Sequence, residues 1–359
     1  MNSHFRFQRR ATQTLSLLGL LVAGSLPTAR AADDLAWPAI TRTQKPWAYN
    51  WWMASAVDKA NITKELTRYR DAGLGGIHII PIYGAKGFET NYITYLSPRW
   101  MEMLRYTVSA AEKLDLGVDM TTGSGWCFGG PKVTDEEANA SVVVKTVEVP
   151  AEGKLQGTFD SKTTQALMAF GPDGKKMDLL SKLGPDDALD WTAEGGPWHV
   201  LAISQRPSGQ RVKRAGPGGE GHMLNLFYPP AMTNFLKWFN DAFANYSGPK
   251  PRAQYHDSYE YRSEWSPDFF AQFERLRGYR LQDELPAMFG RPDDAEHLEI
   301  AGRVKCDYRE TISELMSEVT LPLWVKWSHD HGFITRNEAH GSPGNLLDLY
   351  GVADIPETE

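Results

Sequence analysis

Strand-like and helix-like segments alternate through the first part of the chain, and this alternation constrains the fold more than any other feature. Three apolar runs have the length and composition of buried strands: residues 46–53, 75–84 and 117–126. Of the two helical segments between them, the first is expected to be capped by Asn61 and to end at Gly73, and the second to begin at Ser97. Successive strand–helix–strand units imply right-handed parallel connections, and therefore an α/β sheet or a (β/α) barrel.

A β-rich insertion interrupts the alternation after the third strand. Short β-branched runs with a Pro-Asp-Gly turn begin near residue 141, and the helical pattern returns after residue 222. Further strands are expected at 252–261 and 332–341, a long helical stretch at 295–331, and a sixth strand-like run at 350–356. We therefore predict a (β/α)8 TIM-type barrel that is incomplete in this chain.

These patterns divide the chain into four parts. Residues 32–140 form the first part of the barrel, residues 141–222 the insertion, and residues 223–359 the continuation of the barrel, truncated at its C-terminus. Residues 1–31 read as a signal peptide, because arginines precede a short apolar run and Ala29-Arg30-Ala31 offers small residues for cleavage. Arg9-Arg10 leaves twin-arginine export as the alternative to the ordinary secretory route.

Export to the periplasm or the extracellular space follows from this leader. Its removal takes away four arginines and no acids, so the formal charge changes from −7 to −11. An exported acidic protein is a poor candidate for nucleic acid binding, and the apolar run of the leader is too short for a permanent membrane span. We expect no membrane insertion after signal removal.

The chain has two cysteines, Cys127 and Cys306. Two thiols are too few for a zinc site, and a chain with 42% hydrophobic residues builds a core that needs no disulfide. A single disulfide after export stays the less favoured alternative to two free thiols.

Acids and aromatic residues gather where the predicted strands end. The stretch 255–270 contains Asp257, Glu260 and Glu264 among aromatic rings and without lysines. Alternation along its strand would place His256 and Glu260 on one side, at the mouth of the barrel. The other candidates at strand ends are Trp51, Trp52, Tyr83, Ser124, Trp126, Asn337, Glu338 and His340.

Two carboxylates walled by aromatic rings are what glycosidic bond cleavage requires. One protonates the departing oxygen, and the other activates water or attacks the sugar carbon. Aromatic faces bind the C–H faces of sugars. A structural hydrogen-bond network remains the alternative for Glu260, and His78 within its apolar run is expected to be a core residue. The glycine-rich run 215–221 lacks the ending of a phosphate loop and is read as a tight loop near the site.

Five motifs together resemble glycoside hydrolase family 106, the bacterial α-L-rhamnosidases. They occur in the family's order and are "PWAYNWWM", "TTGSGWCFGGP", "VKRAGPGGEG", "YHDSYEY" and "RNEAHGSPGNLLDLYGVADIPETE". The resemblance implies a (β/α)8 catalytic barrel, removal of terminal L-rhamnose from plant or microbial glycans with inversion, and calcium that assists sugar binding. It also implies a carbohydrate substrate.

The resemblance places the general acid at Glu260, while Glu338 and Glu357 match acidic positions of later motifs without assigned roles. The residues expected to bind substrate are Trp51, Trp126, His256, Asp257, Asn337 and His340. The calcium ligands are unknown, and the oxygen donors considered for them are Asp257, Asn337, Glu338 and Asp354.

Two other classes of function stay open at this point. Asn337-Glu338 at a strand end is also typical of retaining barrel glycosidases, and an incomplete acid pair would suit a non-catalytic carbohydrate-binding fragment. Family members continue past residue 359, so the catalytic base is expected to lie in that later part. We expect residues 1–359 alone to be poorly soluble and inactive.

Overall fold

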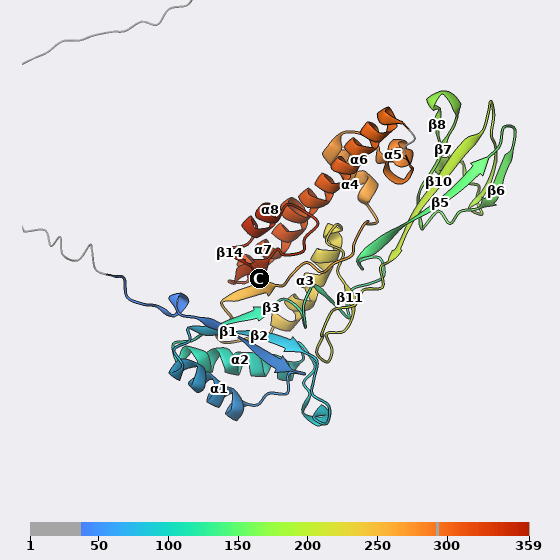
Figure 1. The fold of residues 1–359 in the computed structure, drawn as a ribbon. Coiled ribbons are helices and arrows are strands. Elements are labelled where there is room, and N and C mark those ends of the chain that lie inside the picture. Colours follow the sequence, from blue (N-terminus) through green and yellow to red (C-terminus); the bar gives the residue numbers. More distant parts are fainter. Residues whose placement is uncertain (1–36, 292–293, 359) are drawn as a thin grey trace, which may run out of the picture. The chain divides into compact units, whose positions relative to one another are not determined.

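The computed structural model describes residues 37–291 and 294–358 (Figure 1). The chain divides into a short unit, Met1–Ile40, and a large compact unit, Thr41–Glu359. The predicted signal peptide lies outside the described residues. The large unit contains a parallel sheet, the helices that connect its strands, and a β-rich insertion.

Six parallel strands form the main sheet, and their order in space is their order in the chain. The strands are β1 (Trp47–Met53), β2 (Gly76–Ile82), β3 (Gly117–Thr121), β12 (Ala253–His256), β13 (Ile334–Glu338) and β14 (Ile355–Glu357). Within the described residues β1 and β14 are the edges, so the sheet is not a closed barrel. A parallel α/β sheet is therefore present, as predicted, and the closed TIM barrel stays a prediction.

The sheet is curled rather than flat. The hydroxyl of Tyr49 on β1 donates a hydrogen bond to Oε1 of Glu357 on β14, at 3.4 Å. These two strands lie at opposite edges of the six-stranded sheet. Side chains from both edges can meet only if the sheet bends around them, so it has a concave face that they share.

Helices cover the other face of the sheet. Trp52 of β1 packs against Trp100 of α2 (Pro98–Glu112), with ring centroids 5.6 Å apart. Helix α1 (Lys59–Asp71) begins one residue after Asp58, whose side chain accepts a hydrogen bond from the amide of Asn61. The prediction that Asn61 is the cap is therefore wrong: Asp58 has the extended backbone and the free carboxylate that the position needs.

Trp47 fills the amino-terminal end of the concave face. A Cβ atom added at Gly117 would lie 2.1 Å from its indole ring, and one at Gly76 would lie 2.5 Å from it. The guanidinium of Arg252 lies 3.9 Å from the Trp47 ring centroid. Glycine is needed at these two strand positions because the indole lies directly on their backbone.

The β-rich part has its own core. A four-stranded antiparallel sheet has the order β5-β10-β7-β8, and β6 pairs with β9. A separate apolar cluster with Trp191 and Trp198 fills it. The strands are β5 (Ala140–Val149), β6 (Lys154–Thr158), β7 (Thr164–Phe170), β8 (Lys176–Asp178), β9 (Ala188–Thr192) and β10 (Trp198–Pro207). The short strands β4 (Gly129–Gly130) and β11 (His222–Met223) pair with each other.

The predicted helical stretch after residue 294 contains α6 (Ala295–Glu314), a π-helical segment (Leu315–Thr320) and α7 (Leu321–Asp330). Pro322 has no N–H for the carbonyl four residues earlier, so the ladder is interrupted where the π-helical segment passes into α7. The remaining α-helices are α3 (Pro229–Phe243), α4 (Phe269–Arg277), α5 (Leu285–Phe289) and α8 (Leu346–Gly351).

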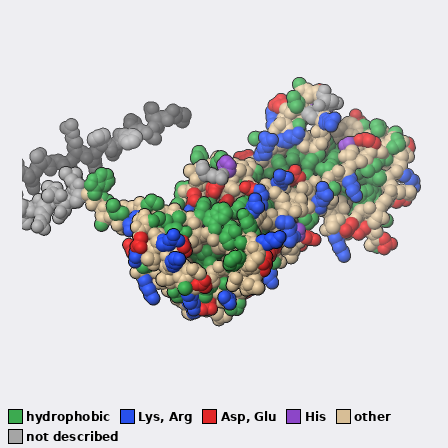
Figure 2. Space-filling view, turned by 60° about the horizontal axis from the view of Figure 1, so that its bottom comes forward, with side chains coloured by type: hydrophobic (Ala, Val, Ile, Leu, Met, Phe, Trp, Pro, Cys, Tyr) green, Lys and Arg blue, Asp and Glu red, His purple; other side chains and the backbone are tan. Residues whose placement is uncertain are grey.

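Figure 2 shows acidic and basic side chains spread over the face it draws, around an area of hydrophobic side chains. In the part of the chain that the structure describes, no helix is both long and apolar enough to cross a membrane. Cys127 is buried, Cys306 is exposed, and both are free thiols.

Candidate active site

Tyrosine and histidine side chains form a layer on the concave face. His78 of β2 lies between Tyr49 and Tyr255, with ring centroids at 5.2 and 4.5 Å, and its Nε2 is 3.0 Å from the hydroxyl of Thr121. Burial lowers the pKa of His78 well below its usual value, and the charge of Arg336 lowers it further. His78 is therefore neutral and buried, but its Nδ1 has no hydrogen-bond partner within the described residues.

Two carboxylates lie at the carboxyl ends of neighbouring strands in this layer. Glu338 on β13 and Glu357 on β14 are register partners. The Tyr255 hydroxyl donates to Oε2 of Glu338 at 2.9 Å, and it lies 3.5 Å from the hydroxyl of Tyr49, which contacts Glu357. Burial, and next the charge of Asp257, raise the pKa of Tyr255, so its phenol keeps the proton it donates. The two tyrosines thus connect the two acids.

A buried ionic network holds Glu357 in place. Asp119 on β3 is fully buried and accepts two hydrogen bonds from Arg252, at 2.9 and 2.6 Å. It also accepts one from Arg336 at 2.8 Å, and Arg336 contacts Glu357 as well. Burial lowers the pKa of Arg336, but these two acids raise it by more, so the guanidinium stays charged. The network fixes Glu357 relative to β13 and β3 and to Arg252, the residue before β12.

Glu260 lies beyond the end of β12 and meets the glycine-rich loop. It forms an ion pair with Lys213. The backbone of this loop approaches the end of β3 closely, because the amide of Trp126 donates to the Lys213 carbonyl at 3.1 Å. A Cβ atom at Gly125, whose φ is +70°, would lie 1.9 Å from that carbonyl oxygen. Lys213, two residues before the glycine-rich run 215–221, is therefore the residue that contacts the predicted general acid.

His256 does not share the mouth with Glu260, so the prediction from strand alternation is wrong. The strand ends at His256, and the alternation does not extend four residues further. The His256 ring stacks on Phe128 at 4.0 Å, and its Nδ1 is 2.9 Å from Oδ1 of Asn337. Because Asn337 uses its amide N–H to bond the Leu349 carbonyl, its oxygen must accept from His256.

The second nitrogen of His256 completes a directed chain of hydrogen bonds. Tyr261 accepts from the Phe128 amide at 2.5 Å and donates to Nε2 of His256 at 3.0 Å. Burial lowers the pKa of His256 to about 4. His256 and Asn337 are each 1% exposed and lie in the wall behind the concave face, and their role in substrate binding stays a prediction.

The other predicted residues lie around the mouth. Trp51 is 49% exposed and shares the strand face of Tyr49, and Trp126 is half-buried beside the glycine-rich loop. Asp257 accepts from the amide of Ser258 at 2.8 Å. His340 is exposed, and its carbonyl accepts from the Tyr259 amide at 2.7 Å, which ties the end of β13 to the segment that carries Glu260.

The oxygen donors considered for calcium do not converge. Asp354 accepts hydrogen bonds from Thr335 and His329, and the Asn337 side chain is committed to His256 and Leu349. Among the described residues no group of three or more His, Cys, Asp or Glu side chains is placed to hold a metal. Calcium binding stays a prediction from the family resemblance, and no step is assigned to an ion.

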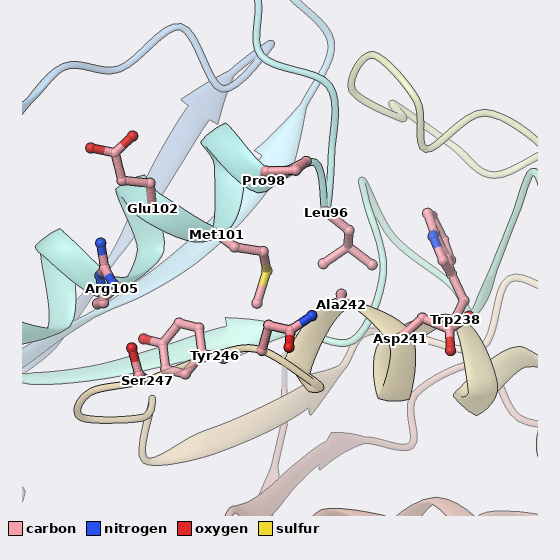
Figure 3. A pocket seen from close by; sticks show the side chains of 11 residues that line it. Leu96, Pro98, Met101, Glu102, Arg105, Trp238, Asp241, Ala242, Tyr246 and Ser247 are labelled. Carbon is pink, nitrogen blue, oxygen red and sulfur yellow. The ribbon is translucent and has the colours of Figure 1, made fainter.

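A cavity of about 490 Å³ opens between α2 and α3 (Figure 3). Its lining includes Met101, Arg105 and Trp238, and none of the acids at the strand ends. It lies among the helices that cover the sheet, away from the concave face. The arrangement of the concave face, with carboxylates at strand ends and exposed rings beside them, is the one that suits sugar chemistry.

Comparison with known proteins agrees with this geometry. Residues 39–168 and 159–359 match the profile of Glyco_hydro_106, the alpha-L-rhamnosidase family. The chain belongs to glycoside hydrolase family 106. The resemblance predicted from the five motifs is confirmed, and it places the chain among glycosidases.

This family 106 chain covers only part of two proteins to which it is similar. A relative from Formosa agariphila, named putative beta-glucuronidase, is 23% identical over 354 residues, covering 85% of this chain and 30% of the relative. The solved rhamnosidase from Novosphingobium sp. PP1Y has a TM-score of 0.74 at 17% identity, covering 88% of this chain and 48% of that one. The structural likeness shows a shared fold. The chain spans less than half the length of either protein.

Sequence reasoning did not identify several side chains of this family 106 site. Lys213 lies in the motif "VKRAGPGGEG", Arg336 precedes Asn337, and Tyr255 is one of several aromatic residues near the predicted acid, so none of the three stands out in the sequence. A signal exists for Arg336, because it lies two residues from Glu338 on one strand and therefore faces the same side.

Proposed function

We propose that the protein is an exported exo-α-L-rhamnosidase that releases terminal L-rhamnose with inversion. The observation that carries the proposal is that Glu338 and Glu357 are paired at the carboxyl ends of β13 and β14, and that Glu260 lies in the segment following the adjacent strand β12, in a family 106 chain. Active sites of parallel α/β barrels lie at this end of the sheet. Exposed rings of Trp51 and Tyr83 supply apolar faces for a sugar beside these acids.

In this proposal Glu260 is the general acid that protonates the departing oxygen. Its ammonium neighbour Lys213 favours the ionised carboxylate, so Glu260 has to leave Lys213 and turn toward the sugar before it can donate. Glu338 accepts a hydrogen bond from Tyr255, which suits a carboxylate that takes a proton from water. The base of the complete enzyme stays unassigned between Glu338, Glu357 and later residues.

Replacement of Glu260 tests the acid role. In the complete gene product, Glu260→Gln should lower turnover of natural rhamnosides by roughly 10²- to 10⁴-fold, because the alcohol then leaves without its proton. An aryl rhamnoside with a good leaving group needs little protonation and should lose far less. Both rates would be measured from released rhamnose.

Glu264→Gln is the matched control, because Glu264 is an exposed acid four residues further along the same segment. It should leave both rates near those of the unchanged enzyme. Equal losses on natural and aryl substrates in Glu260→Gln would remove Glu260 from the acid role.

Export is part of the proposal and rests on the leader sequence. N-terminal sequencing of the mature protein should begin near Ala32. An intact Met1 on a cytoplasmic product would contradict it.

A further inference from the structure

Basic side chains gather on the loop that covers the ends of β2 and β3. The backbone carbonyl of Arg214 accepts from the Tyr83 amide at 3.0 Å, and Lys213 pairs with Trp126 in the same way. Arg262, on the segment of Glu260, donates its amide to Oε1 of Gln210 at 2.6 Å, where this loop begins. We call Arg211, Arg214 and Arg262 the basic rim; all three are exposed.

The basic rim has no carboxylate of its own. Lys213 is paired with Glu260, but within the described residues none of the three rim arginines forms an ion pair. Arg214 instead lies over the ring of Tyr83, 5.4 Å from its centroid. The three rim arginines, on the loop of Lys213 and on the segment of Glu260, therefore have no acidic partner in the part of the chain that the structure describes.

Acids near the loop are engaged elsewhere. Asp135 pairs with Nε2 of His222 at 3.1 Å, and Glu220 accepts from the amide of Gly218 at 2.8 Å. Glu264 shares the segment of Arg262 but forms no ion pair with it among the described residues. These acids therefore do not neutralise the rim arginines.

The chain has a formal charge of −7, so acidic side chains outnumber basic ones overall. A cluster of three arginines without acidic partners is therefore unexpected. Such a rim attracts anions to the mouth and repels cations. Guanidinium groups match the planar, two-oxygen geometry of carboxylates better than an ammonium does. Arg211 and Arg214 lie on the same loop as Lys213, and Arg262 lies two residues beyond Glu260, so the rim flanks both partners of the Lys213–Glu260 ion pair.

We propose that the basic rim selects glycans in which the sugar next to the released one is anionic. The identity of the released sugar rests on the proposed function, whereas the charge preference rests on the rim. The carboxylate of a uronic acid and the sulfate of a sulfate ester both carry the required negative charge.

The test is calorimetric binding of three disaccharides to the complete gene product at about 0.02 M salt, where surface charge is little screened. Rhamnosyl-glucose is the neutral probe, rhamnosyl-glucuronic acid carries a carboxylate, and rhamnosyl-glucose 6-sulfate carries a sulfate. We expect at least one anionic probe to bind about tenfold more tightly than the neutral one. Preference for the carboxylate alone identifies uronic acids as the source, and equal preference for both identifies charge.

Arginine variants decide whether the rim is responsible. Replacement of all three rim arginines by Gln should bring the anionic and neutral affinities to within about twofold, while replacement by Lys should retain part of the preference. The matched control changes three exposed arginines on helices α1, α2 and α6 to Gln: Arg68, Arg99 and Arg303. It removes the same charge and should retain the preference.

Equal binding of all three probes by the unchanged chain contradicts the proposal, as does binding of none. A preference that survives in the rim-to-Gln variant contradicts it too. Failure of the proposed function appears separately, as no hydrolysis of an aryl α-L-rhamnoside by the complete gene product. That result would leave the measured charge preference standing.

Discussion

At the residue scale, the site depends on side chains that hold the acids rather than on the acids alone. Tyr255 donates to Glu338, Tyr49 contacts Glu357, and Arg336 joins Glu357 to the buried Asp119. Motif matching identified the acids because carboxylates are what the chemistry needs. It did not identify their partners, because a tyrosine or arginine on a strand has many ordinary structural uses.

Tyr255 is a positioning residue for Glu338. In Tyr255→Phe the ionised Glu338 loses a donor, so we expect kcat to fall roughly 10- to 100-fold with little change in KM. The acid limb of the pH profile should move to higher pH, because the protonated form of Glu338 becomes easier to reach. Pre-steady-state and steady-state rates on an aryl rhamnoside between pH 4 and 8 measure both effects.

Tyr246→Phe is the control, since its hydroxyl bonds only the nearby Pro249 carbonyl at 2.8 Å. It should leave rate and pH profile unchanged. A loss of rate in Tyr255→Phe without any shift of the acid limb would show that the phenol serves packing alone.

His256 makes stability depend on pH. Its pKa is about 4 in the folded chain because of burial, below the usual value near 6.5. The unfolded chain therefore binds a proton first as the pH falls, and stability is lost between about pH 6.5 and pH 4, by up to about 3 kcal/mol. Urea unfolding across this range measures the loss.

His256→Gln should be less stable than the unchanged chain at pH 7 and should lose less stability toward pH 4. His78 titrates in the same direction and remains in the variant, so some loss persists. His297→Gln, at an exposed helical position, should keep the full loss. An identical pH dependence in His256→Gln and the unchanged chain would show that His256 is not protonated on unfolding.

At the element scale, strands and helices were predictable because their patterns are local. Buried strands such as β2 are continuous apolar runs, and α2 begins at the predicted Ser97-Pro98. The end of β12 was not predictable in this way. His256, the last residue of the strand, makes tertiary contacts with Phe128 and Asn337, and the residues beyond it form the loop that carries Glu260. Alternation of side-chain direction therefore does not predict which way a residue faces once the strand has ended.

Close approach of Trp47 to the strands gives a test of the packing. Gly117→Ala should lower the free energy of unfolding by roughly 1–3 kcal/mol, because the indole has to move from its contact with Arg252. Gly302→Ala in α6 meets nothing within 4 Å and should raise it by about 0.5–1 kcal/mol. Urea unfolding of both variants makes the comparison, and a neutral Gly117→Ala would contradict the placement of Trp47.

At the scale of the whole molecule, the curled parallel sheet brings side chains from its two edges to one face, and family 106 membership gives that face its chemistry. The order of the strands followed from the sequence, because strand–helix units add neighbours in turn. Closure of the barrel is not seen among the described residues and stays a prediction, as does the inactivity of residues 1–359 alone. Long-range ion pairs such as Asp119–Arg336 had no local signal at all.

The central claim is that this site cleaves α-L-rhamnosides with inversion. The most direct measurement is proton NMR of the sugar first released when the complete gene product acts on an aryl α-L-rhamnoside, with an aryl β-D-glucuronide assayed beside it. The account predicts rapid appearance of β-L-rhamnose before mutarotation, and no glucuronic acid. Initial release of α-L-rhamnose, or cleavage of the glucuronide alone, would contradict it.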